Sequence, residues 1–288
     1  MRILMTGSSG PKTGATVARH LAQSHDVAGI DLVAGDNTRH VADITSICDW
    51  RPFLDGVDAL VHFAALHAPH RDTHSQAAFV ALNVEATARL LDAARAAGVR
   101  RFLLASTTSV YGQAMRTAPT TGRAAWVTEA LVPEPEDIYD ETKLAAEALC
   151  REAFSDTFTT AALRFSRCFP EPLPLMAVYR LHRGIDARDV AQAFEHALAA
   201  PLMAFVAFNV SGATPFLESD CELLWQDAPG VLEARVPELV DAFARRGWPL
   251  PGQIDRVYVP AKAGAALGFA PRFGWQHAIE GPQKDAVS

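Results

Sequence analysis

Short apolar runs alternate with longer amphipathic stretches through the first two thirds of this 288-residue chain. Runs rich in Val, Ile, Leu and Phe that are bounded by polar or turn-forming residues are typical of buried strands. They predict strands over residues 2–5, 27–31, 59–63, 101–105, 159–164 and 205–210, with one further short strand before Asp43.

Between these runs, apolar positions recur every three or four residues, which is the period of a helix packed on one side. The pattern predicts helices over residues 13–23, 75–97, 137–154 and 187–200, and Gly98 is a typical stop for the second of them. Strand, helix and parallel strand in repeated order predict an α/β fold, a doubly wound parallel sheet with helices on both faces. Ligands of such sheets bind beyond the carboxyl ends of the strands.

After about residue 210 the alternation gives way to Pro- and Gly-rich sequence with one expected helix over residues 237–246. We therefore expect a sheet domain over residues 1–165. A smaller region over residues 166–288, interleaved with the last strands, is expected to form a small C-terminal cap.

Composition argues against several classes of protein. Hydrophobic residues make up 49% of the chain and charged residues 20%, as in soluble globular proteins, and the longest apolar stretch (residues 202–208) is far shorter than the roughly 20 residues of a membrane span. The net charge of −7, without a basic run, argues against nucleic acid as a partner. Four cysteines without CxxC spacing and no signal peptide ahead of the first strand predict a cytoplasmic protein without a zinc site.

The first strand leads into a glycine-rich turn before a helix, with the sequence Thr6-Gly7-Ser8-Ser9-Gly10-Pro11-Lys12-Thr13-Gly14. Glycines let such a turn approach a pyrophosphate closely, and amides at the start of the helix stabilise its charge. Gly7, Ser9, Gly10, Lys12 and Gly14 are candidate contacts of a dinucleotide, with a plain strand-to-helix loop as the alternative. A triphosphate loop of the GxxxxGKT type is excluded because the residue before Lys12 is proline, which has no amide hydrogen.

Asp31 ends the second strand about 20 residues after Gly10, where a carboxylate accepts hydrogen bonds from an adenosine ribose and repels a 2′-phosphate. This position favours NAD over NADP, and a simple turn aspartate is the alternative. Asp43 and Ile44, after the short third strand, are candidate contacts of the adenine edge, with a solvated aspartate as the alternative for Asp43.

Tyr139 and Lys143 lie four residues apart near the start of a predicted helix and so project from one face. A neighbouring ammonium stabilises a phenolate and lowers a pKa that is normally about 10, which makes tyrosine a general base near neutral pH. The chain has only four tyrosines, so this spacing is seldom a coincidence. An amphipathic helix with a surface lysine is the alternative.

A cluster of hydroxyl side chains, Ser106-Thr107-Thr108-Ser109, follows the predicted strand that ends at Ala105. A hydroxyl at a strand's carboxyl end can donate a hydrogen bond to a substrate oxygen whose charge changes during the reaction. Ser106 and Thr108 are therefore candidate substrate contacts. Hydroxyls in such a position also cap loops.

These motifs stand in the order found in the extended short-chain dehydrogenase/reductases of the NAD-dependent epimerase/dehydratase family, which the chain resembles over roughly residues 1–275. The resemblance implies a Rossmann fold, NAD as cofactor, residues 1–165 as the NAD-binding domain and residues 166–288 as the substrate-binding region. It is carried by Thr6-Gly7-x-x-Gly10, Asp31, His62-Phe63-Ala64-Ala65, Asn83-Val84-Glu85-Ala86-Thr87, Ser106-Thr107-Thr108-Ser109-Val110-Tyr111-Gly112, Tyr139-x-x-x-Lys143, Leu163-Arg164, Asp186-x-Arg188-Asp189-Val190 and Leu267-Gly268-Phe269-Ala270-Pro271.

The resemblance also implies roles for individual residues. Tyr139 becomes the catalytic base, Lys143 holds the nicotinamide ribose, and Thr107 orients the substrate oxygen, with Ser106 as the alternative. Ala64 and Ala65 line the dinucleotide, and Asn83 supports the proton path from the long helix beside the site.

Three departures from the family pattern narrow the expected activity. Three residues instead of two separate Gly10 from Gly14, which changes the pyrophosphate turn and leaves Lys12 as a possible compensating contact. No acidic residue follows Thr107, which disfavours sugar dehydration. Only residues 171–185 lie where nucleotide-sugar members carry a long insertion, so we expect a pocket for a free sugar or sugar acid.

The stretch from Cys168 to Leu181 resembles uronate dehydrogenases, in which an arginine binds the substrate carboxylate. Arg180 is the matching candidate, because a guanidinium pairs bidentately with a carboxylate, and a surface arginine is the alternative. His67, His70 and His74 have a spacing that metal ligands can have, but without a neighbouring acidic or cysteine ligand we expect no metal.

The favoured hypothesis is a NAD-dependent oxidoreductase that acts on a secondary hydroxyl of a sugar or sugar acid, as a dehydrogenase or an epimerase. A nucleotide-sugar 4-epimerase and a catalytically silent dinucleotide-sensing regulator are the alternatives. Family members commonly pair through two long helices, here residues 75–97 and 137–154, so the resemblance implies a homodimer.

Overall fold

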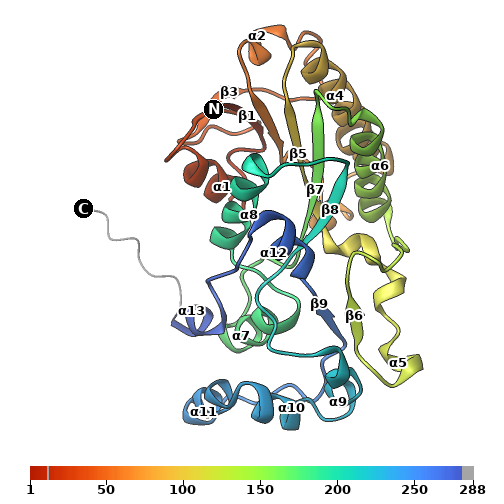
Figure 1. The fold of residues 1–288 in the computed structure, drawn as a ribbon, viewed down its shortest axis with the longest axis vertical. Coiled ribbons are helices and arrows are strands. Elements are labelled where there is room, and N and C mark those ends of the chain that lie inside the picture. Colours follow the sequence, from red (N-terminus) through yellow and green to blue (C-terminus); the bar gives the residue numbers. More distant parts are fainter. Residues whose placement is uncertain (12, 281–288) are drawn as a thin grey trace.

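The computed structural model describes residues 1–11 and 13–280, so Lys12 and residues 281–288 lie outside the described residues. Its centre is a seven-stranded sheet in the order β3-β2-β1-β4-β5-β7-β8, and every pairing in it is parallel (Figure 1). The strands are β1 (Arg2–Thr6), β2 (Asp26–Asp31), β3 (Thr38–Val41), β4 (Ala59–His62), β5 (Arg101–Thr107), β7 (Thr159–Phe165) and β8 (Val206–Val210). The predicted doubly wound sheet is confirmed, and strand ends differ from the predicted ones by one or two residues.

Helices cover both faces of the sheet because successive side chains of each buried strand point to opposite sides. Leu103 packs in one core with α1 (Gly14–Leu21), α8 (Ala187–Ala199) and α12 (Ala261–Leu267). Its neighbours Phe102 and Leu104 pack in the other core with α2 (Arg51–Leu54), α4 (Ala86–Ala96) and α6 (Ile138–Ala153). The central strands of the sheet are therefore apolar on both sides, as the continuous apolar runs predicted.

The single helix predicted over residues 75–97 is divided into three segments. α3 (Gln76–Val80) and α4 are joined by a π-helical turn over Ala81–Glu85. A π-turn inserts one extra residue into a helix and is found mostly at functional sites. Here it surrounds Asn83, whose side chain leaves the helix to bind a neighbouring loop.

A second, smaller lobe lies beyond the carboxyl ends of the strands, at the lower end of Figure 1. Its core joins Trp275, Phe243 and Leu181 from separate helices. The expected helix over residues 237–246 is present as α11, but the lobe holds more regular structure than expected. Three of its other helices have only six to eight residues, which is too short to establish a period in the sequence. The lobe contains α7 (Leu173–His182), α9 (Cys221–Gln226), α10 (Ala228–Arg235), α11 (Pro237–Arg246) and α13 (Trp275–Glu280).

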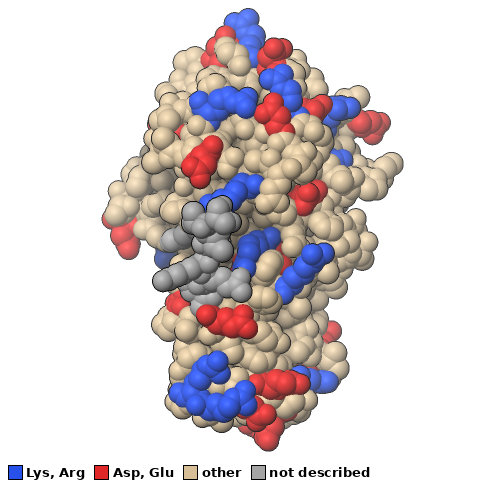
Figure 2. All heavy atoms as spheres, turned by 90° about the vertical axis from the view of Figure 1, so that its left-hand side faces the viewer, with Lys and Arg blue, Asp and Glu red and all other residues tan. Residues whose placement is uncertain are grey.

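This cap also draws on the first half of the chain. β6 (Ala125–Val127), which follows α5 (Ala118–Thr121), pairs in parallel with β9 (Arg256–Tyr258). Residues 125–127 thus precede the expected domain boundary at residue 165 and contribute a strand to the cap. Within the described ranges, no helix combines the length and apolar character that crossing a membrane requires. On the face seen in Figure 2, basic and acidic side chains are interspersed.

Candidate active site

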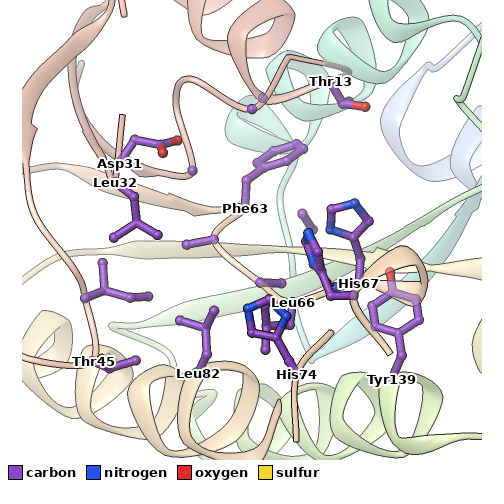
Figure 3. A pocket seen from close by; sticks show the side chains of 18 of the residues that line it. Thr13, Asp31, Leu32, Thr45, Phe63, Leu66, His67, His74, Leu82 and Tyr139 are labelled. Carbon is purple, nitrogen blue, oxygen red and sulfur yellow. Dashed lines mark hydrogen bonds between the residues drawn. The ribbon is translucent and has the colours of Figure 1, made fainter. Parts of the chain in front are cut away.

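A cavity of about 820 Å³ opens at the carboxyl ends of the strands. Asp31 and Leu32 lie at one end of it and Tyr139 at the other, with Phe63 and Leu66 between them (Figure 3). Most of the residues predicted from the sequence to bind a dinucleotide line this cavity: Gly7, Gly10, Gly14, Asp31, Asp43, Ile44, Ala64, Ala65 and Lys143.

Two glycines of the turn are required by close backbone packing. Gly7 has a φ of +74°, and a Cβ there would lie 2.6 Å from the Ala64 nitrogen. A Cβ on Gly14 would lie 2.1 Å from the Gly7 carbonyl oxygen. Gly10 differs, because the nearest atom to its Cβ position is 3.6 Å away. Its open side borders the cavity at the N-terminal end of α1, where backbone amides favour an anion.

Asp31 is held in place by backbone donors. Its Oδ2 accepts a hydrogen bond from the Ser9 amide at 2.8 Å, and its Oδ1 accepts one from the Val33 amide at 3.2 Å. The Ser9 hydroxyl lies 2.5 Å from the Thr38 hydroxyl on β3. Ser9, predicted to contact the dinucleotide, is not among the described residues that line the cavity, and it ties the turn to Asp31 and β3. Lys12, also predicted to contact the dinucleotide, lies outside the described residues.

Asp43 reaches the cavity from a turn that it stabilises itself. Its Oδ1 accepts hydrogen bonds from the Thr45 amide at 2.8 Å and the Thr45 hydroxyl at 2.7 Å. Ile44 is buried beside it, so an apolar and a polar surface meet at this end of the cavity.

A buried hydrogen-bonded chain connects the first strand with the π-turn. The Ala64 amide donates to Thr6 Oγ1, and the Thr87 hydroxyl donates to the Asn83 carbonyl oxygen. His62 Nδ1 lies 2.6 Å from Thr6 Oγ1, and His62 Nε2 lies 2.9 Å from Thr87 Oγ1. Because Thr87 uses its proton on Asn83, Nε2 must donate to Thr87 and Nδ1 must accept from Thr6. These contacts therefore fix one neutral tautomer of His62.

Asn83 anchors the loop that forms the wall of the cavity. Its Oδ1 accepts from the Leu66 amide, and its Nδ2 donates to the Leu66 carbonyl oxygen, both at 2.9 Å. Nδ2 also donates to the Thr142 hydroxyl on α6 at 3.0 Å. The resemblance implies that Asn83 supports the proton path beside the cofactor; in the structure it is buried and is not among the described lining residues.

The end of the cavity that is predicted to be catalytic is built on the first turns of α6. The Asp137 side chain accepts from the Asp140 amide and begins the helix. Tyr139 follows in the first turn, and its hydroxyl is hydrogen-bonded to Thr107 at the end of β5. The Thr107 hydroxyl also accepts from the Ser109 amide at 3.1 Å, which orients it. The sequence predicted this meeting of Thr107 and Tyr139.

The pKa of Tyr139 differs from the expectation. Burial raises this pKa above its ordinary value, the hydrogen bond with Thr107 offsets part of the rise, and the charges of Asp140 and Asp137 raise it further. Lys143 was expected to lower the pKa of Tyr139. Lys143 is not among the groups whose charges shift this pKa in the structure, and desolvation of the phenol is the largest cause of the shift.

Lys143 is itself almost fully buried. Burial lowers its pKa to about 8, while the neighbouring Glu147 and Cys150 oppose this shift. Burial, with the Lys143 charge as a second cause, lowers the pKa of His62 to about 3. The ammonium is therefore the dominant positive charge at this end of the cavity, next to a histidine that stays neutral.

Three predicted substrate contacts are not among the described residues that line the cavity. The Ser106 hydroxyl donates to Glu147 at 2.6 Å, and Thr108 is buried in a short 3-10 helix over Thr108–Tyr111. Arg180 Nη2 is 3.1 Å from the Asp186 carboxylate, while the buried Arg180 Nε has no hydrogen-bond partner within the described residues.

Sequence reasoning missed the aromatic and imidazole side chains of the cavity wall. Lining residues without a predicted role include Phe63, His67, His70, His74 and Phe169. Phe63 packs against Phe194 with ring centroids 4.7 Å apart. The spacing of the histidines was weighed as a metal motif, with a substrate-contacting or plain loop histidine as the favoured interpretation, and among the described residues no group of three ligands could hold a metal ion.

The parallel sheet, the glycine turn and the acidic end of β2 define a Rossmann-type dinucleotide-binding protein. The model of the NAD dependent epimerase/dehydratase family matches residues 3–170. This stretch is more than half of the chain, and the protein therefore belongs to that family.

Individual relatives share a modest fraction of identical residues with this chain. The chain is 28% identical over 204 residues to the uncharacterized UDP-glucose epimerase YtcB of Bacillus subtilis (strain 168), which covers 63% of this chain and 61% of that protein. A short-chain dehydrogenase/reductase superfamily protein from Agrobacterium tumefaciens with bound NAD has a similar structure, with a TM-score of 0.71, 24% identity and coverage of 97% of this chain and 95% of that one. A mutated uronate dehydrogenase superposes with a TM-score of 0.67 at 20% identity, covering 99% of this chain and 87% of that one.

Proposed function

We propose that this protein is a NAD-dependent oxidoreductase that acts on a secondary hydroxyl of a sugar or sugar acid. The observation that carries the proposal is the contact of Tyr139 with Thr107. Tyr139 lines one end of a cavity whose other end presents Asp31. Membership of the epimerase/dehydratase family supports the same chemistry.

The residues of the cavity fit NAD. Gly10 leaves an open backbone surface at the start of α1, where a pyrophosphate would lie. The Asp31 carboxylate would accept from the adenosine ribose, and Asp43 and Ile44 would contact adenine. Ala64, Ala65 and Lys143 would flank the remainder, with Lys143 at the nicotinamide ribose. When bound, NAD supplies the acceptor and donor of a hydride.

Side chains of the protein transfer the proton of the substrate hydroxyl. Thr107 orients the substrate oxygen, and Tyr139 exchanges a proton with it. Because burial raises the pKa of Tyr139, the phenol keeps its proton at neutral pH and is prepared to donate to a ketone oxygen. Removal of a hydroxyl proton requires this pKa to fall, and the Lys143 ammonium, four residues along the same helix, is the group that can lower it.

The test is a screen of sugars, sugar acids and nucleotide sugars with NAD and with NADP, followed by NADH absorbance and product analysis. A dehydrogenase accumulates NADH in proportion to product, whereas an epimerase forms product without it. We expect activity with a free sugar or sugar acid. If no compound of either kind reacts while NAD binds, the dinucleotide-sensing alternative replaces this proposal.

A nucleotide-sugar 4-epimerase is the second candidate, favoured by the resemblance to YtcB, whose name describes a UDP-glucose epimerase. Against it, α7 is the one helix between β7 and α8 in the described chain, which leaves little structure for binding a nucleotide. Turnover of UDP-sugars in the same screen would favour this candidate.

We also propose a cytoplasmic homodimer that pairs through α4 and α6, with residues 1–165 as the NAD-binding part and residues 166–288 as the substrate-binding part. The test for the dimer is the molar mass in solution, measured by light scattering on the full chain. A monomer at micromolar concentration would contradict it.

A further inference from the structure

Three charged side chains are buried together beneath the catalytic end of the cavity. The exposed fractions are 4% for Lys143, 2% for Glu147 and 5% for Arg164. Burial of charge is costly unless each group finds a partner, so such a cluster needs an explanation in its contacts. Glu147 and Arg164 have had no role in the proposed reaction.

Glu147 is fixed by three donors. Its Oε1 accepts from the Ser106 hydroxyl at 2.6 Å and from Arg164 Nε at 2.9 Å. Its Oε2 accepts from Arg164 Nη2 at 2.6 Å. The pair is therefore bidentate, which is the strong and directional form of an arginine–carboxylate contact. Both oxygens of Glu147 already have partners before Lys143 is considered.

Arg164 is fixed in turn from its other side. Its Nη1 donates to the Tyr111 hydroxyl at 3.1 Å, and the guanidinium lies 5.0 Å from the centre of that ring. The Tyr111 hydroxyl donates to Asn209 Oδ1 at 2.7 Å, and Asn209 Nδ2 donates to the Val127 carbonyl oxygen at 3.2 Å. The network thus runs from α6 through β7 and β8 to β6 of the cap.

Lys143 lies one helical turn before Glu147 on the same helix, so the two side chains share a face. Yet Lys143 forms no ion pair within 4.0 Å of any carboxylate in the described part of the chain, whereas Arg164 does. The groups whose charges act on it are Glu147 and Cys150 on α6, and it acts on His62 of β4. The charge of Glu147 therefore acts on the Lys143 ammonium, although no ion pair joins the two groups.

We propose that Glu147, held by Arg164 and Ser106, is a positioning residue for catalysis. The negative charge of Glu147 stabilises the Lys143 ammonium. Because the carboxylate is held in its bidentate contact with Arg164, it does not form an ion pair with that ammonium. The ammonium then remains free to serve Tyr139 and the cofactor ribose. This inference rests on the proposed function and extends it to two residues that do not touch the cavity.

Two single substitutions, one of Glu147 and one of Arg164, are expected to shift the pKa of Lys143 in opposite directions. Glu147→Gln removes the negative charge, so the pKa of Lys143 falls by about one unit. Arg164→Gln removes a positive charge and releases the carboxylate toward Lys143, so that pKa rises. Both variants lose turnover, by about tenfold or more. In Glu147→Gln the Lys143 ammonium loses its proton near neutral pH, and in Arg164→Gln the released carboxylate binds the ammonium and holds it away from Tyr139.

The readout is NMR titration of isotope-labelled lysine side chains, in full-length protein without substrate, together with the pH profile of kcat. Thr160→Val is the matched control: it removes another buried hydroxyl bond between β7 and α6, from Thr160 to the Cys150 carbonyl oxygen at 2.6 Å, without touching Glu147. It should leave the lysine titration and the pH profile in place, although it lowers the melting temperature.

A purely structural network predicts lower stability without a shift of the Lys143 titration, or shifts of the same sign in both variants, and either result overturns the proposal. If an unpaired charge prevents folding, the double variant Glu147→Gln with Arg164→Gln replaces both groups by neutral amides. Wild-type kcat in that variant also overturns it. Because the titration needs no substrate, failure of the proposed activity would leave the Lys143 result interpretable.

Discussion

The two ends of the cavity are built in different ways. At the dinucleotide end the surface consists of backbone, with Gly7 and Gly14 in close packing, Gly10 open to the cavity, and a carboxylate, Asp31, held by backbone amides. At the catalytic end Tyr139 and Lys143 line the cavity, and buried side chains beneath them are connected by hydrogen bonds.

One end of the cavity therefore depends on the shape of the backbone, and the other depends on the charges of side chains. The glycine end depends on the absence of side-chain atoms, so substitutions there should disturb packing and binding while leaving the chemistry intact. The α6 end depends on the charge state of buried groups, so isosteric substitutions there should abolish turnover while leaving binding intact.

The largest effect is expected at the catalytic end. Tyr139→Phe removes the proton carrier and should lower kcat by about 10²- to 10⁴-fold, with NAD affinity unchanged. Steady-state kinetics and calorimetry measure the two quantities. Tyr179→Phe, on α7 and not among the lining residues, is the control. Full turnover in Tyr139→Phe would remove the distinction between the two ends.

The next effect concerns the glycine end. Gly7→Ala places a Cβ 2.6 Å from the Ala64 nitrogen at a φ of +74°, so the free energy of unfolding should fall by about 3 kcal/mol. Gly98→Ala meets the same backbone strain at a φ of +78° but nothing within 4 Å, and should cost about 1 kcal/mol. Equal losses in chemical denaturation would contradict the packing argument.

A smaller effect follows from the neutral histidine. The pKa of His62 is about 3 in the folded protein against 6.5 as the ordinary value, so between these pH values the unfolded chain binds a proton that the folded protein does not. Stability therefore decreases as the pH falls, by about 2 kcal/mol between pH 6.5 and about pH 4.5 from this residue.

Denaturation of wild type and His62→Asn at both pH values isolates this contribution. The variant should be less stable at neutral pH and should lose less on acidification. The exposed His277→Asn serves as the control. Identical pH dependence of wild type and His62→Asn would show that this histidine is not held neutral.

The smallest effect is expected at Asp31. Asp31→Asn keeps a hydrogen-bonding side chain but removes the charge that repels a 2′-phosphate, so NAD should bind about fivefold more weakly and the preference over NADP should narrow. Asp43→Asn is the variant for comparison, because it also removes a carboxylate from this end of the cavity, one that caps its own turn. Calorimetry with both dinucleotides measures the ratio, and an unchanged ratio would place cofactor selection elsewhere.

Much of the sheet and the cavity could be predicted because the signals are local. Apolar runs mark the strands, and Gly7, Asp31 and Tyr139 each follow a recognisable pattern within a few residues. The order of the strands then brings them to one edge. The roles assigned to Ser106 and Arg180 were less secure, because a hydroxyl or a guanidinium near a site takes whichever partner the tertiary structure offers, here Glu147 and Asp186.

Other features depend on contacts that no sequence window contains. The π-turn at Asn83 exists because a loop and α6 both offer partners to one amide. The elevated pKa of Tyr139 follows from burial, which the spacing to Lys143 does not reveal. A signal for Glu147 was nevertheless present, since it follows Lys143 by one helical turn in the sequence.

The pairing of β6 with β9 has a consequence for how the protein is made. During synthesis the edge of β6 is finished long before its partner strand leaves the ribosome, and until then its backbone groups stay open to other chains. A fragment that stopped after the large sheet would keep that open edge permanently. Expression trials should therefore retain the region around Val257 even when the dinucleotide half is the target.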